Sequence, residues 1–147
     1  DLSLPLKKRR RALVAHCRVK SADHTRTLLL FNIHLGLAGF ERTVQLRRIL
    51  ASSPLQHTRH DTGVIVAGDF NDVWGTLGSR MLEPAGFEAA CKKRRTFPAV
   101  LPMRPLDRVY FRGALELDHS FASRTEVARQ ASDHLPLVTV FRIPQLT

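Results

Sequence analysis

The feature that most constrains the fold is an apolar run that leads directly into a group of polar side chains. Residues 63–68 read Gly-Val-Ile-Val-Ala-Gly without polar alternation, which predicts a central strand buried on both faces. Asp69, Asn71 and Asp72 follow this run almost at once. In an open sheet, ligands bind beyond the strand ends, where loops converge. We therefore expect a polar site at one rim of a sheet.

Hydrophobic periodicity places further strands and helices around this strand. Alternation predicts a strand over 27–35, one face of which turns from Leu28 and Leu30 to the polar Asn32 and His34 toward its end. The other expected elements are a strand over 12–19, a turn over 20–26, a helix over 40–51, a short helix over 77–84 that ends before Gly86, a surface loop over 92–105, and strands over 107–111, 115–122 and 137–141.

Together these elements predict an α/β (α+β) fold, a mixed β-sheet with helices on one face. The long helix joins two strands in a βαβ-like unit, whereas hairpins make the other pairings antiparallel. Helices on one face leave the other face apolar and uncovered. The candidate residues for that uncovered face are Leu28, Leu30, Val64 and Val66.

The charge of the chain favours acidic partners. Its 147 residues hold 23 Lys+Arg against 13 Asp+Glu, a formal net charge of +10. Such a charge fits nucleic acid, an anionic lipid surface or a phosphorylated small molecule, and it also fits a basic surface without a partner. The basic clusters at 7–11 and 92–95 are candidate contacts to a phosphate backbone, or else solvated loops.

Composition excludes several classes of protein. An apolar share of 44% with 24% charged residues is an ordinary globular mixture, so a wholly disordered chain is excluded. No apolar run approaches the ~18 residues of a membrane span, so we expect no transmembrane segment. Cys17 and Cys91 are too few for a disulfide scaffold. They fit two buried thiols or a reducing compartment, and we expect a cytoplasmic location.

Four polar clusters fall at expected strand ends and supply the groups that phosphoester chemistry needs. A phosphoester requires a cation to neutralise its oxygens, a carboxylate to orient water and an imidazole that accepts or shares a proton. Each cluster alone also has a structural interpretation: an Asx turn at Asp69 or before Pro136, a core role for His34, or an ion pair at Asp107. Four such clusters together favour a catalytic site. They are Asn32 with His34, Asp69 with Asn71, Asp107, and Asp133 with His134.

Four ordered motifs resemble the endonuclease/exonuclease/phosphatase superfamily, the group of pancreatic-type deoxyribonuclease, apurinic endonucleases, inositol-polyphosphate phosphatases and bacterial sphingomyelinases. Arg42, Gln45 and the segment Thr96-Phe97-Pro98 are also similar to the family, and the resemblance covers residues 11–141. The four motifs are Asn32-Ile33-His34-Leu35, Gly68-Asp69-Phe70-Asn71, Leu106-Asp107-Arg108-Val109-Tyr110 and Ser132-Asp133-His134-Leu135-Pro136.

The resemblance implies a divalent-metal-dependent hydrolase of phosphoester bonds, with Mg²⁺ or Mn²⁺ as cofactor and an activated water as nucleophile. Asp69 would orient or activate this water, and Asn71 would help to hold the water and the phosphate. His134 would be the general base or proton partner, with Asp107 fixing its tautomer. His34 would contact a phosphate oxygen.

The remaining site residues implied by the resemblance hold metal and substrate. Asp133 and Asp69 are the candidate metal ligands. Asn32 and Arg108 are the candidate substrate-binding residues.

One departure from the family is large, because its first strand with an Asn and its main metal-binding Glu have no counterpart here. The chain also begins with Asp1 rather than Met. We therefore expect residues 1–147 to be the C-terminal part of a single domain of this family, one half of a four-layer α/β sandwich. Too few oxygen ligands would then remain for a hard cation, so the metal would be held poorly. The uncovered sheet face would bind the missing N-terminal half or a second copy of the chain.

Two functions stay open at this stage. The first is a nuclease, phosphodiesterase or phosphatase that acts on a phosphorylated substrate, nucleic acid or a phospholipid headgroup. The second is a non-catalytic binding or scaffold module that retains the fold. The missing Glu favours the module, whereas the intact Asp69 and His134 favour the enzyme.

Overall fold

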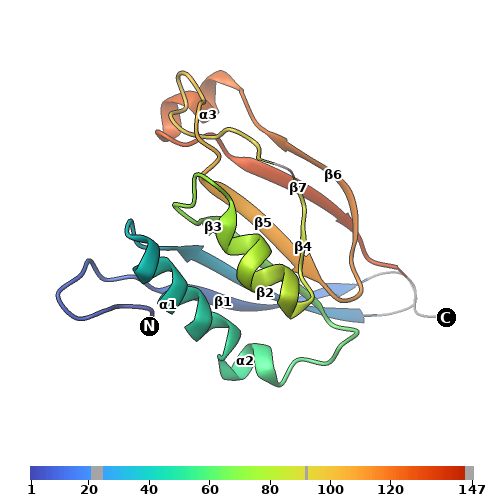
Figure 1. Ribbon diagram of the computed structural model, residues 1–147. Helices are drawn as coiled ribbons and strands as arrows, with labels where there is room; N and C mark the ends of the chain where they lie inside the picture. Colours follow the sequence, from blue (N-terminus) through green and yellow to red (C-terminus); the bar gives the residue numbers. More distant parts are fainter. Residues whose placement is uncertain (21–24, 92, 145–147) are drawn as a thin grey trace.

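A five-stranded mixed sheet forms the centre of the molecule (Figure 1). The computed structural model describes residues 1–20, 25–91 and 93–144. β2 and β3 run parallel and are joined by a helical crossover, whereas the other neighbours run antiparallel. The predicted mixed sheet with its βαβ-like unit is thus confirmed. In spatial order the strands are β1 (Ala12–Lys20), β2 (Thr25–His34), β3 (Gly63–Asp69), β5 (Asp107–Arg112) and β4 (Glu88–Ala89).

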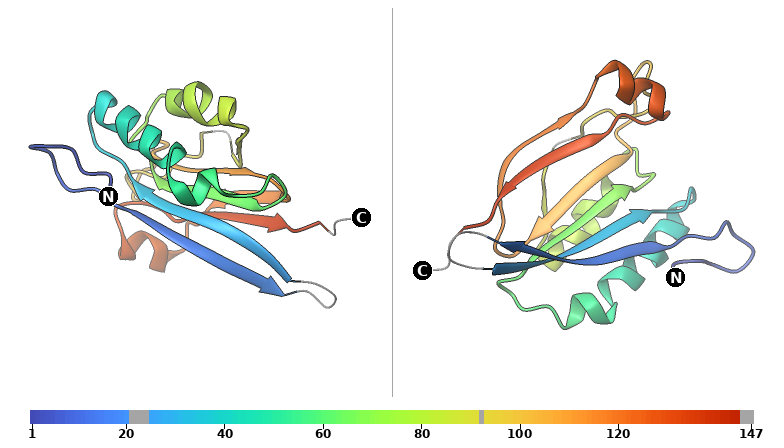
Figure 2. Two further views of the ribbon diagram at one scale, coloured as in Figure 1. Left: turned by 90° about the horizontal axis from the view of Figure 1, so that it is seen from below. Right: turned by 180° about the vertical axis from the view of Figure 1, so that it is seen from behind.

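The helices that connect β2, β3 and β4 cover one face of this sheet (Figure 2). Leu46, Ile49 and Leu82 on these helices are at most 1% exposed and pack on Leu29 and Phe31 of β2 in one hydrophobic core. Both predicted helices, over 40–51 and 77–84, are confirmed. Their bounds are α1 (Gly39–Leu50), α2 (Ser53–Gln56), the π-helical turn η1 (Gly78–Leu82) and the 3₁₀ turn η2 (Glu83–Ala85).

A second, two-stranded sheet lies on the opposite face. It consists of the antiparallel strands β6 (Glu116–Ala122) and β7 (Leu137–Arg142), joined through the short helix α3 (Glu126–Ala131). Phe141 of β7 packs on Phe111 of β5 with ring centroids 5.0 Å apart. The expectation that no strand covers this face is therefore wrong in part, because two of the predicted strands leave the main sheet and pack on it.

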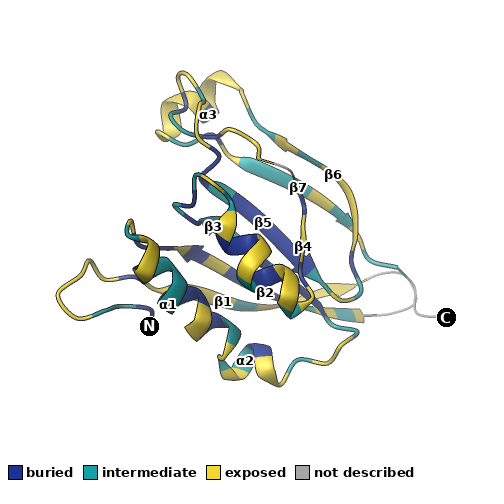
Figure 3. Cartoon of the chain, in the orientation of Figure 1, coloured by how far each residue is buried: buried dark blue, intermediate teal, exposed yellow. Residues whose placement is uncertain are grey.

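The predicted composition of the two sheet faces needs one correction. Val64 and Val66 are fully buried on the helix side, because the parallel register pairs them with Leu29 and Phe31. Leu28 lies on the other face, as expected, and contacts the core beneath β6 and β7. An uninterrupted apolar run has no alternation to fix which face each residue takes. The predicted burial of the strand over 63–68 agrees with the structure, because β3 and β5 are the most buried strands, whereas β1 and β6 are largely exposed (Figure 3).

The segment expected to be a surface loop, 92–105, packs partly into the molecule over its described residues, 93–105. Thr96 and Ala99 are buried, and Phe97 forms an isolated bridge with Arg104. The amides of Ala99 and Leu135 make hydrogen bonds that tie this loop to residues 133–135. The loop therefore supports the segment that precedes β7.

Three further expectations concern the turn, the thiols and the membrane. The predicted turn over 20–26 falls largely on residues 21–24, which lie outside the described residues. Both cysteines are free thiols, and Cys17 is exposed rather than buried. Within residues 1–20, 25–91 and 93–144, no helix has the length and apolarity needed to cross a membrane.

We expect Gly68→Ala to destabilise the fold far more than Gly86→Ala. Both glycines have positive φ, +133° and +80°, but a Cβ at Gly68 would lie 2.0 Å from the carbonyl oxygen of Ile33, whereas a Cβ at Gly86 meets nothing within 4 Å. Gly86→Ala should cost about 1 kcal/mol from backbone strain alone. Gly68→Ala should cost roughly 3 kcal/mol or more, because β2 and β3 must separate. Urea unfolding measures both, and equal midpoints would contradict the strand contact.

Candidate active site

The register of the main sheet brings three polar side chains together at one rim. His34 is the last residue of β2 and Asp69 the last of β3, and the parallel register makes them partners. Asp69 is also the register partner of Asp107, the first residue of β5. Neighbouring strands of a sheet are only ~4.8 Å apart. Sheet pairing alone therefore places His34, Asp69 and Asp107 side by side.

His134 completes the cluster from the segment that precedes β7. Its Nδ1 lies 2.8 Å from Oδ2 of Asp107, and its Nε2 lies 4.0 Å from Oδ2 of Asp69. Oδ2 of Asp69 is also 3.5 Å from Nε2 of His34. Carboxylates and imidazoles thus alternate along the rim in the order Asp107, His134, Asp69, His34.

The contact with Asp107 sets the tautomer of His134. A carboxylate accepts hydrogen bonds, so it favours the proton on Nδ1 and leaves the lone pair on Nε2. Asp107 is itself oriented, because the hydroxyl of Thr96 donates to the same Oδ2. The ring of Phe97, with its centroid 4.9 Å from that of His134, flanks the imidazole. His134 is therefore held with Nε2 turned toward Asp69.

Asn71 reaches the rim by a turn and not by an extended strand. Its φ is +50°, and its amide N–H donates to Oδ1 of Asp69 over 2.8 Å. Its side-chain Nδ2 donates to the carbonyl of Leu35 over 2.9 Å. The Asx turn that the sequence offers at Asp69 as a structural alternative is thus present, and it lies within the candidate site. The turn still leaves the side-chain oxygen of Asn71 without a hydrogen bond among the described residues.

Burial and charge shift the pKa values of the cluster in different directions. Burial alone would lower the pKa of His134, but the hydrogen bond to Asp107 and the charges of Asp107, Asp69 and Asp133 raise it above its ordinary value. The pKa of His34 is lowered, first by burial and then by the nearby Arg10. The pKa of Asp69 is raised, mainly by burial. The pKa values of the two imidazoles are therefore shifted in opposite directions, upward for His134 and downward for His34.

Basic side chains surround the acidic cluster in an open cavity of about 630 Å³. Lys8, Arg10 and Arg104 line it together with the cluster. Arg10 is only 9% exposed, and its Nε has no hydrogen-bond partner among the described residues. The sequence indicated a basic cluster at 7–11 but not its place in the site. The proximity of Arg10 to the strand that begins at Ala12 was the available signal.

The other predicted site residues lie in different surroundings. Asp133 is exposed in the same cavity. Asn32 lines a neighbouring cavity of about 450 Å³ that shares Asp107 and His134 with the first. The guanidinium of Arg108 does not join the cluster, since the residue is 6% exposed and Nη2 donates to the carbonyl of Asp72. Its guanidinium supports the turn after β3, and the residue also lines the cavity of Asn32. Substrate binding by Asn32 and Arg108 stays a prediction.

The carboxylates do not form a complete metal site. Among the described residues, no group of three or more His, Cys, Asp or Glu side chains is arranged to hold a metal ion. Oδ2 of Asp107 already accepts from Thr96 and pairs with His134, and Oδ1 of Asp69 accepts from Asn71. Mg²⁺ requires about six oxygen ligands in octahedral geometry. Asp69 and Asp133, the predicted metal ligands, do not meet this requirement by themselves.

Comparison with known proteins gives a family and relatives without an assigned activity. The chain matches the model of the Endonuclease/Exonuclease/phosphatase family over residues 5–134. The uncharacterized protein YbhP of Escherichia coli K12 is 31% identical over 130 residues, which are 84% of this chain and 50% of the relative. YbhP of Shigella flexneri matches equally well. The chain thus spans about half the length of the curated relatives it matches.

Solved structures share the fold over most of this chain. A functionally unknown protein from Enterococcus faecalis V583 matches 85% of the chain and 54% of its own, with a TM-score of 0.68 and 19% identity. Humanized TDP2 of D. rerio matches 90% of this chain and 61% of its own, with a TM-score of 0.66 and 25% identity. The mannosyl-6-phosphatase Bt3783 of Bacteroides thetaiotaomicron matches 89% of this chain and 57% of its own, with a TM-score of 0.67 and 14% identity. Because the family model matches residues 5–134, the chain belongs to the Endonuclease/Exonuclease/phosphatase family, and its motifs and rim agree with this assignment.

Proposed function

We propose that the protein hydrolyses phosphoester bonds with an activated water at the rim formed by Asp107, His134, Asp69 and His34. The observation that carries this proposal is the 2.8 Å contact between Asp107 and His134, which leaves Nε2 of His134 facing Asp69. A carboxylate that orients an imidazole is a recurrent arrangement for moving a proton at a reacting group. Membership of the family and the phosphatase among its structural neighbours support the same reaction class.

Each residue of the rim has a role that follows from its surroundings. Asp69, buried beside two imidazoles, orients the attacking water. His134 accepts or shares a proton through Nε2 as water attacks phosphorus and the P–O bond to the leaving group breaks. The imidazole of His34 and the free amide oxygen of Asn71 position the phosphate and the water, respectively. The cations Lys8, Arg10 and Arg104 balance the charge of the bound phosphate.

A divalent cation, Mg²⁺ or Mn²⁺, belongs to this proposal only for the full-length protein. It would neutralise phosphate oxygens. The described carboxylates do not supply its ligand set, so further oxygen ligands are required. Prolonged treatment of the full-length protein with a chelator, followed by separate return of each cation, tests this part of the proposal.

The substrate class is either nucleic acid or a smaller phosphorylated molecule such as a lipid headgroup. The net charge of +10 and the basic wall of the cavity favour a polyanion. Turnover of DNA that falls steeply with salt would support a nuclease, because each phosphate contact releases counterions. Turnover confined to phospholipid vesicles would support a lipid phosphodiesterase.

Removing either central group of the rim should abolish most of the turnover. We expect Asp69→Asn and His134→Asn, made separately in the full-length protein, to lower kcat by about 10²-fold or more. His119→Asn is the matched control, because His119 is exposed on β6 and pairs with Asp118 away from the cavity. Near-normal kcat in both rim variants would rule out this mechanism.

The pH dependence should report on the contact between Asp107 and His134. His134 acts as a base only when neutral, so its raised pKa places the acid limb of the kcat profile above about pH 6.5. Asp107→Asn removes a negative charge that favours the imidazolium, so both the limb and the NMR titration of His134 should move to lower pH. The other histidines serve as internal controls in the same spectra. A titration of His134 that Asp107→Asn leaves unchanged would contradict the assigned contact.

A non-catalytic binding module is the second candidate function. The observation that favours it is the lack, among residues 1–20, 25–91 and 93–144, of a three-ligand metal cluster. Such a module would bind phosphorylated ligands with the same cavity but would release no product in the presence of either cation. Detectable turnover that depends on Asp69 and His134 decides for the enzyme.

A further inference from the structure

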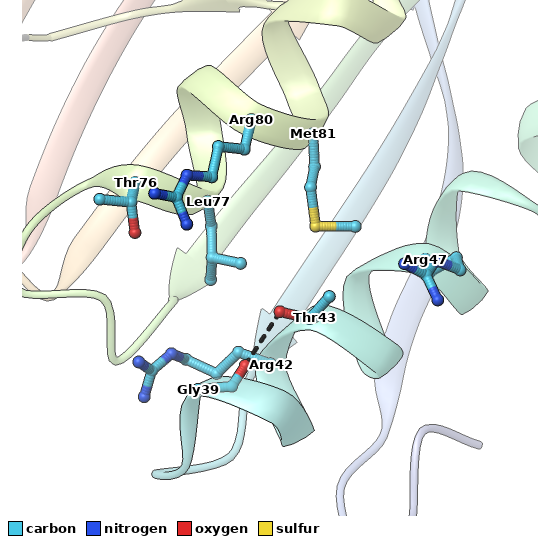
Figure 4. A pocket seen from close by; sticks show the side chains of 8 residues that line it. All are labelled: Gly39, Arg42, Thr43, Arg47, Thr76, Leu77, Arg80 and Met81. Carbon is cyan, nitrogen blue, oxygen red and sulfur yellow. Dashed lines mark hydrogen bonds between the residues drawn. The ribbon is translucent and has the colours of Figure 1, made fainter.

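A third pocket lies on the helix-covered face of the sheet, apart from the two cavities at the acidic rim. It has a volume of about 340 Å³ and lies between α1 and the helical segment that contains η1 (Figure 4). Arginine and threonine side chains line it together with the apolar Leu77 and Met81. Its full lining is Gly39, Arg42, Thr43, Arg47, Thr76, Leu77, Arg80 and Met81.

The pocket concentrates positive charge without an acidic counterpart. Arg42 and Arg47 project from α1 and Arg80 from η1, and no carboxylate is among the lining residues (Figure 4). In the described part of the chain, none of the three arginines forms an ion pair. Guanidinium groups match the geometry of phosphate oxygens and bind them through paired hydrogen bonds. Three such groups around one hollow indicate a site for a phosphate group.

Arg42 is already fixed in place before any ligand binds. One of its guanidinium nitrogens donates to the carbonyl of Leu37, which anchors the side chain. Its Nε is buried and has no hydrogen-bond partner among the described residues. A fixed side chain loses less entropy when a ligand binds.

Both walls of the pocket continue from the segments that build the acidic rim. Leu37, which holds Arg42, also lines the rim cavity. On the other wall, the amide of Leu77 donates to Asp72 over 2.7 Å, directly after the turn that carries Asp69 and Asn71. The walls of this pocket are therefore built by segments that directly follow those of the acidic rim in the chain.

We propose that the pocket of Arg42, Arg47 and Arg80 is a subsite for a second phosphate group of the same substrate molecule. This inference rests on the proposed phosphoester hydrolysis and narrows its substrates to molecules that carry a phosphate beyond the scissile one. A nucleic acid strand and a small polyphosphorylated molecule share this chemistry. The rim binds the reacting phosphate, and the arginine pocket selects ligands with another phosphate within reach.

The test compares ligands with one and with several phosphates in the full-length protein. The variant is Arg47→Gln with Arg80→Gln, two exposed positions whose change should leave the fold intact. The matched control, Arg18→Gln with Arg129→Gln, removes the same charge from exposed positions on β1 and α3. Equilibrium binding is measured with p-nitrophenyl phosphate, 5′-phosphorylated tetrathymidylate and inositol hexakisphosphate, in the presence of a chelator that prevents turnover.

We expect the pocket variant to weaken binding of at least one multiply phosphorylated ligand by about 10-fold or more, because two charge-assisted contacts are lost. The loss of affinity of the pocket variant for p-nitrophenyl phosphate should be no greater than that of the control variant. Selective loss for tetrathymidylate assigns the subsite to a nucleic acid strand, and selective loss for the inositol phosphate assigns it to a small polyphosphate. Equal losses in variant and control, or equal losses for all three ligands, overturn the subsite.

This outcome is independent of the reaction proposed for the rim. Selective loss of binding together with no turnover of any ligand would retain the subsite and reject the hydrolase. Turnover that depends on Asp69 without selective loss of binding would retain the hydrolase and reject the subsite.

Discussion

The candidate active site depends on the pairing of β3 with its two neighbours. The parallel register with β2 and the antiparallel register with β5 place His34, Asp69 and Asp107 in one row at the rim. The backbone hydrogen bonds of the sheet fix this arrangement, so it does not depend on the conformation of a loop. Of the four rim residues, only His134 lies outside the sheet. The loop around Thr96 and Ala99 holds the segment of His134 through backbone hydrogen bonds. The arrangement of His34, Asp69 and Asp107 is therefore as stable as the central sheet.

Much of the fold was predictable because its signals are local. The alternation before His34, the apolar run before Asp69 and the glycine that ends the helix at 85 each fix one element from its own residues. The phase of an uninterrupted apolar run is not a local property, which is why Val64 and Val66 were assigned to the wrong face. The separation of β6 and β7 into a second sheet depends equally on tertiary packing, above all between Phe111 and Phe141.

The same difference between local signals and tertiary packing applies to the site residues. The order of polar clusters along the chain indicates which residue types meet, but not how each is oriented. Asn71 enters the site through a left-handed turn, and Arg108 turns away from it because alternate residues of β5 face opposite sides of the sheet. Arg10 and Lys8 precede β1 outside any helix or strand, so their position in the cavity depends on tertiary packing. The charge pattern indicates that basic side chains are abundant, whereas tertiary packing decides which of them line the cavity.

We propose that one phosphate group binds between His134, Asp69 and His34. A crystal structure of the full-length protein with inorganic phosphate is the most direct test. We expect a phosphate oxygen or its bridging water within hydrogen-bond distance of Nε2 of His134, with Nδ1 still paired to Asp107. A fully occupied phosphate elsewhere, with the rim empty, or a His134 that has turned away from Asp107, would contradict it.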